Sequence, residues 1–175
     1  MKKSFAEILT GLDEGTGKKV KKKIPAWEGA VIPSALSLEQ CSSQAAAEYK
    51  CRLLKGFFPK GPNSVCDLTC GLGVDSLAFS RVASRVLYNE MNSERAEAAR
   101  HNFTLLGAGN IEVISHCVQP EDSLSEPGAA DSCSFWAALR EFRPDLVYMD
   151  PARRSATGGK VFLLEDCSPD VLTLL

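Results

Sequence analysis

The sequence lacks the features that mark several common classes of protein. No apolar stretch is long enough to cross a bilayer, and a formal net charge of −2 excludes a generally basic coat for nucleic acid. Its seven cysteines include no Cys-x-x-Cys pair, which argues against a zinc site and against a secreted disulfide framework. We therefore expect a cytoplasmic protein with reduced thiols, no metal site and no membrane partner.

The N-terminal part has less regular periodicity than the rest. Residues 4–12 fit a short capped helix, whereas residues 13–36 combine glycines, a lysine run and two prolines, which favours a linker or arm. The run, five lysines between positions 18 and 23, is either a solvated tail or a local patch for nucleic acid. We take 1–36 as an N-terminal helix and basic linker and 37–175 as the folded domain.

Strand and helix patterns alternate along the folded domain. Short apolar runs predict strands, and amphipathic runs predict helices. The expected strands are 64–68, 85–90, 111–114 and 145–149, and the helices after the first one are 75–83, 94–106 and 134–142. This alternation implies an α/β fold, a parallel sheet flanked by helices on both faces, with the ligand crevice at the carboxyl ends of the strands.

The start of the domain's first helix has two readings. Ser37-Leu38-Glu39-Gln40 fits a capping box, whereas Ser43 fits the N-cap of a helix over residues 44–55. In the second reading Cys41-Ser42-Ser43 is a loop whose two hydroxyls are free for a ligand. The apolar stripe expected on this helix comprises Cys41, Ala45, Tyr49 and Leu53.

Two closely spaced glycines join the first strand to the next helix. In Asp67-x-x-x-Gly71-x-Gly73 the glycines let the backbone approach a ligand, and the acid can bind a cation or an ammonium group. A dinucleotide fingerprint would need a third glycine where Ser76 stands. Glu90 ends the second strand, where an acid can accept hydrogen bonds from both ribose hydroxyls. The combination indicates a cofactor that contains a nucleoside.

The segment Asp150-Pro151-Ala152-Arg153-Arg154 follows the fourth strand. It sets a carboxylate, a rigid turn and two guanidinium groups at the crevice mouth. Such a turn suits the orientation of a substrate, and arginine can hold a phosphate through two hydrogen bonds. The alternative is an ordinary strand-end turn with surface arginines.

Together these motifs resemble the class I S-adenosylmethionine-dependent methyltransferases. Asp67 to Phe79 is similar to their first motif, Glu90 to their ribose-binding acid, and Asp150 to Arg153 to the motif that holds the target atom. More narrowly, residues 24–175 resemble the bacterial methyltransferases that carry a C-terminal THUMP-like domain. The segments behind this narrower resemblance are 38–43, 67–69, 73–76, 150–154 and 166–171.

The resemblance implies S-adenosylmethionine as the cofactor, RNA as the expected substrate and a Rossmann-like sheet as the fold. The cofactor-binding residues that it implies are Ser42, Ser43, Asp67, Thr69, Gly71, Gly73, Asp75, Glu90, Met91 and Cys117. The glycine turn would receive the methionine moiety, Glu90 the ribose and residues 115–118 the adenine. Asp150 and Pro151 would orient the nucleophile, and Arg153 or Arg154 would hold a phosphate or carboxylate.

The sequence departs from the family pattern at three places. Ala152-Arg153 lacks the second proline and the aromatic ring of the amino-methylating enzymes, and is nearer the Asp-Pro-Pro-Arg of RNA 5-methyluridine enzymes. Cys117 replaces the acid that contacts the adenine amine in many relatives. Ser168-Pro169-Asp170 fits the start of a helix that residues 171–175 cannot complete. We therefore expect a chain truncated after its fourth strand, without the THUMP-like part, whose exposed edge favours self-association.

Overall fold

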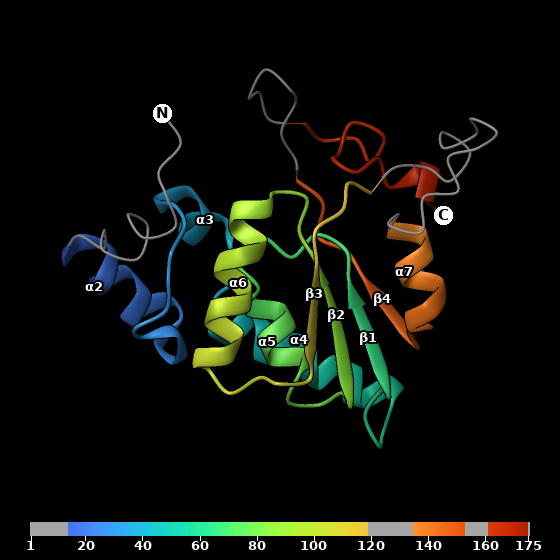
Figure 1. The fold of residues 1–175 in the computed structure, drawn as a ribbon, viewed down its shortest axis with the longest axis horizontal. Helices are drawn as coiled ribbons and strands as arrows, with labels where there is room; N and C mark the ends of the chain where they lie inside the picture. The colour runs from blue at the N-terminus through green and yellow to red at the C-terminus, as the bar shows by residue number, and fades with distance from the viewer. Residues whose placement is uncertain (1–13, 119–134, 153–160, 175) are drawn as a thin grey trace.

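The computed structural model describes residues 14–118, 135–152 and 161–174. Four parallel strands form one sheet in the order β3-β2-β1-β4 (Figure 1). They are β1 (Ser64–Asp67), β2 (Arg85–Asn89), β3 (Ile111–Ile114) and β4 (Leu146–Tyr148). The chain runs outward from β1 to β3 and then returns to β4 on the other side of β1. This reversal of strand order beside β1 is the point at which α/β sheets open a ligand crevice.

Helices cover both faces of the sheet (Figure 1). Two short elements begin the described chain, α2 (Glu14–Lys23) and the 3-10 turn η1 (Pro25–Trp27), and a second 3-10 turn, η3 (Leu172–Leu174), ends it. The other helices are α3 (Ala35–Gln40), α4 (Gln44–Phe57), α5 (Val74–Phe79), α6 (Ser93–Leu105) and α7 (Phe135–Phe142). Helices α4, α5 and α6 pack on one face of the sheet, and α7 packs on the other.

The alternation of side chains along the central strands explains the two cores. Val65 and Val86 point into the cluster formed with α4 to α6, while the next residues, Cys66 and Leu87, point toward α7. All four side chains are at most 1% exposed. A sheet buried on both faces favours strands with apolar residues on both sides, and the middle residues of β1 and β2 fit this pattern.

Within the expected linker 13–36, the described residues 14–36 are not the extended arm that the composition favours. Residues 14–23 form α2, and Ile24 and Trp27 are at most 1% exposed in the main core. The buried Asn102 amide on α6 accepts from Val31 N–H at 2.7 Å and donates to Val31 C=O at 2.8 Å. Burial of large apolar side chains therefore outweighs the local glycine and proline signals. The expected helix over 4–12 lies outside the described residues.

Of the two expected helix starts, one is corrected and the other is confirmed. Ser34, not Ser37, caps α3, accepting from Ser37 N–H at 3.0 Å. The alternative reading of Ser43 is confirmed, because its hydroxyl accepts from Ala46 N–H at 3.2 Å at the start of α4. Cys41 to Ser43 therefore form the connection between two helices.

The prediction of which face of α4 is buried is wrong, because the buried face is rotated by part of a turn from the expected apolar stripe. Tyr49 and Leu53 are 55% and 47% exposed, while Ala47, Cys51 and Leu54 face the core. The core-facing set follows the spacing of one helix face. This phase brings Lys50 to the border of the buried face.

The C-terminal segment forms a β-bridge instead of the expected helix start. Ser168 exchanges two backbone hydrogen bonds with Ala152, at 3.0 and 3.1 Å, in an antiparallel bridge. Asp170 then supplies the oxygen that accepts from Leu172 N–H at 2.9 Å, which starts the short turn η3.

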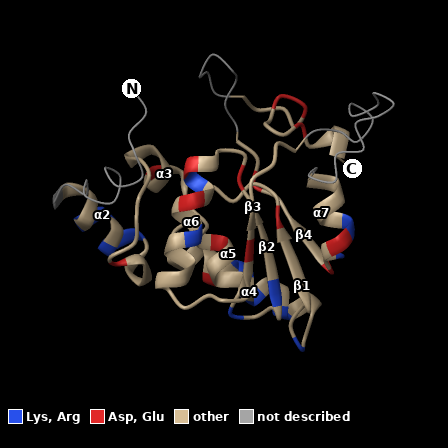
Figure 2. Cartoon of the chain, viewed as in Figure 1, with Lys and Arg blue, Asp and Glu red and all other residues tan. Residues whose placement is uncertain are grey.

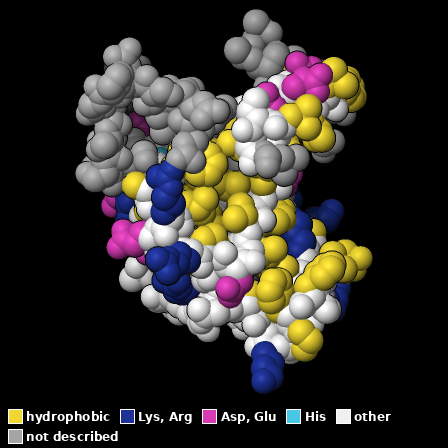
Figure 3. All heavy atoms as spheres, turned by 90° about the vertical axis from the view of Figure 1, so that its right-hand side faces the viewer, with side chains coloured by type: hydrophobic (Ala, Val, Ile, Leu, Met, Phe, Trp, Pro, Cys, Tyr) yellow, Lys and Arg dark blue, Asp and Glu magenta, His cyan; other side chains and the backbone are white. Residues whose placement is uncertain are grey.

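Apolar side chains gather on the face that carries β4 and the C-terminal segment (Figure 3). Val147 on β4 is 45% exposed, and Phe162, Leu163 and Leu164 are 51% to 78% exposed. Across residues 14–118, 135–152 and 161–174, no helix combines the length and the apolar character needed to span a membrane.

Candidate functional site

The carboxyl ends of the four strands bring the predicted site segments together. Thr69 after β1 accepts from the Asp150 N–H after β4, at 2.8 Å. Asn89 at the end of β2 contacts the turn after β3. Its side-chain amide accepts from His116 N–H at 3.0 Å and donates to His116 C=O at 3.1 Å. The same amide donates to Leu68 C=O at 3.2 Å. The turns after β1, β3 and β4 are thus fixed to one another around a single edge.

Asp67 lies at the centre of this edge and is buried. Its side chain is 1% exposed, accepts from Ser76 Oγ at 2.6 Å, and accepts weakly from Thr69 N–H at 3.4 Å. Burial raises the pKa of the Asp67 carboxyl to about 6, and the nearby Asp75 charge adds to the rise that Ser76 opposes. Ser76, which stands where a dinucleotide fingerprint has glycine, is therefore the main hydrogen-bond partner of this acid.

The two glycines of the turn differ in the space around their Cβ positions. Both have positive φ, +55° at Gly71 and +92° at Gly73. A Cβ on Gly73 would lie 2.7 Å from Phe103 Cζ, so this position is closed by ring packing inside the protein. A Cβ on Gly71 would meet no atom within 4 Å, and Tyr88 Oη holds this turn by donating to Gly71 C=O at 2.6 Å. Of these two glycines, Gly71 has the open Cβ position and Gly73 the closed one.

Glu90 follows β2 with a buried side chain, 7% exposed. One carboxylate oxygen, Oε1, accepts from Asn92 N–H at 2.9 Å, and the Glu90 C=O accepts from Ser115 Oγ at 2.9 Å. The acid is therefore held in place by its own turn and by the turn after β3. Its neighbour Met91 is 66% exposed, and Cys117 is exposed on the turn after β3.

The hydroxyls of Ser42 and Ser43 have separate partners. Ser43 Oγ caps α4, whereas Ser42 Oγ donates to Asp75 Oδ2 at 2.7 Å. Asp75 in α5 also receives Lys50 Nζ at 2.9 Å, and the same ammonium group donates to Tyr148 Oη at 2.7 Å. The structure thus brings Ser42 and Asp75 into direct contact and adds Lys50 and Tyr148, which the motifs do not include, to the same group of hydrogen bonds.

Lys50, Tyr148 and Asn89 are missed by reasoning from motifs. The sequence contains one indication for Lys50, because this lysine directly precedes the core-facing Cys51 of an amphipathic helix. It contains another for Asn89, which is a polar residue at the end of an otherwise apolar strand. Arg153 and Arg154 lie outside the described residues, so their roles stay predictions, while Asp150 is exposed and Pro151 half-buried beside it.

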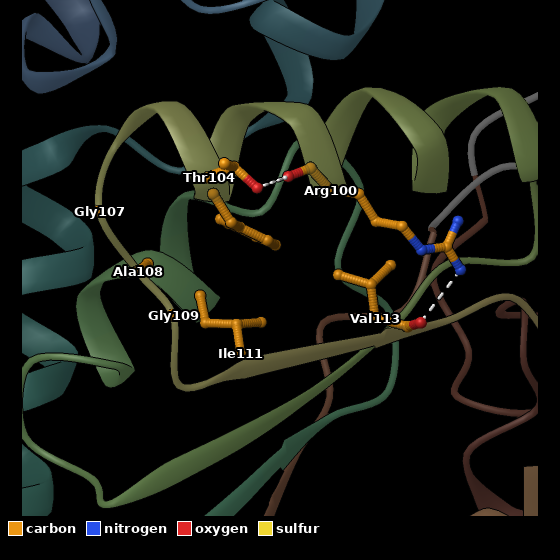
Figure 4. Close-up of a pocket in the computed structure, with 8 residues that line it drawn as sticks. Arg100, Thr104, Gly107, Ala108, Gly109, Ile111 and Val113 are labelled. Atoms are coloured by element: carbon orange, nitrogen blue, oxygen red, sulfur yellow. Dashed lines mark hydrogen bonds between the residues drawn. The ribbon is translucent and has the colours of Figure 1, made fainter.

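A groove of about 440 Å³ lies away from this edge, between α6 and the outer strand β3 (Figure 4). Phe103, Ile111 and Val113 contribute apolar side chains to it, and Arg100 crosses one end to donate to Val113 C=O at 3.0 Å. None of the predicted cofactor or substrate residues lines this groove.

Within the described ranges, no group of three or more His, Cys, Asp or Glu side chains is arranged to hold a metal ion.

No protein-family model matches the chain. It is 30% identical over 133 residues to a 23S rRNA (uracil(1939)-C(5))-methyltransferase of Methylococcus capsulatus, covering 76% of this chain and 27% of that protein. It is 28% identical over 139 residues to an uncharacterized S-adenosylmethionine-dependent methyltransferase of Mycobacterium tuberculosis, covering 79% of this chain and 31% of that protein.

A solved structure extends the likeness to the fold. A protein of Porphyromonas gingivalis W83, provisionally named a methyltransferase, superposes with a TM-score of 0.66 and 30% identity, over 97% of this chain and 41% of that one. The sheet is the Rossmann-like sheet of that structure. The predicted fold class is confirmed, and the chain spans less than half the length of each of these three proteins.

Proposed function

We propose that this chain binds S-adenosylmethionine at the carboxyl edge of its sheet and serves methyl transfer to RNA. The observation that carries the proposal is the convergence of Asp67, Glu90 and the turn after β3 on one edge, beside a glycine whose Cβ position is open. A nucleoside with a cationic amino acid attached requires such an order of groups: an acid, a glycine turn and a second acid on the next strand.

The side chains present fit this cofactor. Gly71 leaves space for a ligand against the backbone, and Glu90 holds a carboxylate ready for ribose hydroxyls. Asp67 is a buried acid whose pKa is raised by its burial, with a further rise from the Asp75 charge. An ammonium group nearby would supply a compensating positive charge. Residues 115–118, fixed by Asn89, then form the wall proposed for the adenine.

The cofactor, when bound, supplies an electrophilic methyl group on a positively charged sulfur. Transfer of such a group depends mainly on alignment and on the exclusion of water. The part of the chain suited to alignment is the Asp150-Pro151 turn, whose backbone N–H is anchored on Thr69 at 2.8 Å. In this proposal Asp150 orients the acceptor atom, and Arg153 holds a neighbouring phosphate.

RNA is the acceptor we propose, because the Methylococcus capsulatus relative is named for methylation of 23S rRNA.

Fewer lysines of the lysine run are available to bind nucleic acid than the length of the run indicates. Lys21 pairs with Glu28 at 2.9 Å, and Lys23 Nζ donates to the Leu38 and Glu39 carbonyls at the end of α3. Lys18, Lys19 and Lys22 are exposed for contact with a phosphate backbone, and Figure 2 shows basic residues along α2. The narrower kinship with THUMP-like enzymes and a cytoplasmic location belong to the same proposal.

Calorimetric titration with S-adenosylhomocysteine tests the cofactor site. We expect saturable binding that Asp67→Ala abolishes and Glu90→Ala weakens, while the groove variant Thr104→Ala binds as the wild type does. Absence of binding by a folded sample would refute the proposal.

Methyl transfer from labelled S-adenosylmethionine to ribosomal or transfer RNA tests the activity. Binding without transfer would limit this chain to cofactor binding.

A further inference from the structure

Four polar side chains form one connected cluster between α4, α5 and the end of β4. We call Ser42, Lys50, Asp75 and Tyr148 the Lys50 cluster. The Lys50 ammonium group donates to Ser42 Oγ at 2.9 Å, to Asp75 Oδ2 at 2.9 Å and to Tyr148 Oη at 2.7 Å. An ammonium group has three donors, so these three contacts use all of them. Ser42 Oγ closes the cluster by donating to Asp75 Oδ2 at 2.7 Å.

The cluster is largely shielded from water. The Lys50 and Asp75 side chains are 26% and 13% exposed. Burial alone would lower the pKa of Lys50, but its hydrogen bonds to Asp75 and Tyr148 and the Asp75 charge raise that pKa overall. Burial raises the pKa of Tyr148 to about 12, so its hydroxyl stays protonated at neutral pH. Lys50 is therefore a charged tether at every pH at which the protein would work.

Asp75 depends on this tether more than an ordinary surface acid does. Its Oδ1 atom is buried and has no hydrogen-bond partner among the described residues. Ser42 and Lys50 therefore supply the compensation seen for this carboxylate, all of it on Oδ2. Removal of the ammonium group would leave a buried charge without its counter-ion, which is far more costly than loss of an exposed pair.

The three partners of Lys50 stand beside three separate parts of the proposed site. Ser42 belongs to the α3–α4 connection, Asp75 follows the glycine turn by two residues, and Tyr148 precedes Asp150 by two residues. These partners are 8, 25 and 98 positions from Lys50 in the sequence. A single side chain thus joins the start of its own helix to two segments, around Asp75 and Tyr148, that lie far from it in the sequence. Phe79 steadies the last of them by packing edge-on to the Tyr148 ring at 5.1 Å.

We propose that Lys50 is a positioning residue that holds the methionine side of the cofactor site and the Asp150 turn in one arrangement, by neutralising Asp75. The inference rests on the function proposed above. It also gives Asp75 an indirect role, because both of its carboxylate oxygens face the protein. Lys50 itself does not touch the cofactor in this proposal.

The test compares Lys50→Met with Lys55→Met in titrations with S-adenosylhomocysteine. Both substitutions remove one ammonium group from α4 and keep an unbranched side chain of nearly the same length, but Lys55 is exposed and lies outside the Lys50 cluster. We expect Lys50→Met to weaken binding about tenfold or more, because an unpaired buried Asp75 would displace its segment, and Lys55→Met to bind as the wild type does. Circular dichroism establishes that each variant is folded at the temperature of titration.

A double variant separates positioning from general loss of structure. In Lys50→Met combined with Asp75→Asn, the buried charge disappears together with its counter-ion, so affinity should recover most of the loss. A folded Lys50→Met protein that binds normally, or a double variant no better than the single one, would overturn the proposal. Should Lys50→Met fail to fold, Tyr148→Phe keeps the ring and removes one contact, with a few-fold weaker binding expected and unchanged binding refuting the idea. Failure of the wild type to bind would refute the proposed function instead.

Discussion

Replacement of Asp67 by Asn should stabilise the protein in a manner that depends on pH. The carboxyl is 1% exposed, and burial raises its pKa from 3.8 to about 6 in the folded state. The folded protein therefore binds a proton at Asp67 more tightly than the unfolded chain does. Stability falls as pH rises from about 4 to about 6, and the penalty is fully present above that range. An asparagine carries no charge and escapes the penalty.

The size of the effect follows from the pKa difference. A shift of about two pKa units corresponds to about 3 kcal/mol of unfolding free energy above pH 7, and to less than about 1 kcal/mol at pH 4. The amide keeps only one acceptor oxygen, so it loses one of the hydrogen bonds that the carboxylate accepts from Ser76 and Thr69, which costs about 1 kcal/mol at all pH values. We expect Asp67→Asn to be more stable than the wild type by about 2 kcal/mol at pH 8 and to have no advantage at pH 4.

Thermal unfolding of the two proteins between pH 4 and pH 8 measures this difference. About 2 kcal/mol corresponds to a rise in Tm of about 4 to 8 °C for a chain of this size. Glu97→Gln, which removes an exposed charge on α6, controls for the change in net charge. An equal Tm difference at both pH values, or a wild type that is more stable at pH 8, would contradict the burial of an ionised Asp67.

Two further predictions concern the same turn. Gly73→Ala should lower the free energy of unfolding by about 2 to 4 kcal/mol, because of the positive φ and the collision with the Phe103 ring. Gly71→Ala should lower it by only about 1 to 2 kcal/mol but should block cofactor binding. Denaturant unfolding and S-adenosylhomocysteine titration of both variants measure these effects, and the opposite order would contradict the two roles. Binding of S-adenosylhomocysteine at pH 6 should release a proton from Asp67, whose folded pKa is about 6, so the measured enthalpy should change with the ionisation enthalpy of the buffer, and Asp67→Asn should remove that dependence.

The positions of the main site acids follow from the sequence because they depend on local patterns. A short apolar run that ends in Asp67 and two glycines predict a strand, a turn and a helix, and the carboxyl ends of parallel strands must share one edge. Glu90 and Asp150 are placed by the same rule. The strands are found within one or two residues of their expected bounds.

The sequence is less informative where tertiary contacts decide the outcome. The glycines, lysines and prolines of residues 13–36 favour an arm, yet burial of Trp27 and the Asn102 contacts with Val31 dock this segment on the domain. The two glycines of the turn read alike in the sequence. Their difference depends on Phe103, thirty residues away, which closes one position and not the other. Such distant partners leave no signal in a motif.

The residues that hold the site together are those that the motifs omit. Lys50 fixes the β4 side of the edge through Asp75 and Tyr148, and Asn89 fixes the β3 side through His116. Both connect to the turns beside Asp67, the buried acid in the middle. Because Asp67 destabilises the fold when it is ionised, the strands and helices alone would favour a relaxed edge in which water reaches this carboxylate. The two polar tethers oppose that relaxation, and in doing so they preserve a buried acid that a positively charged ligand would compensate.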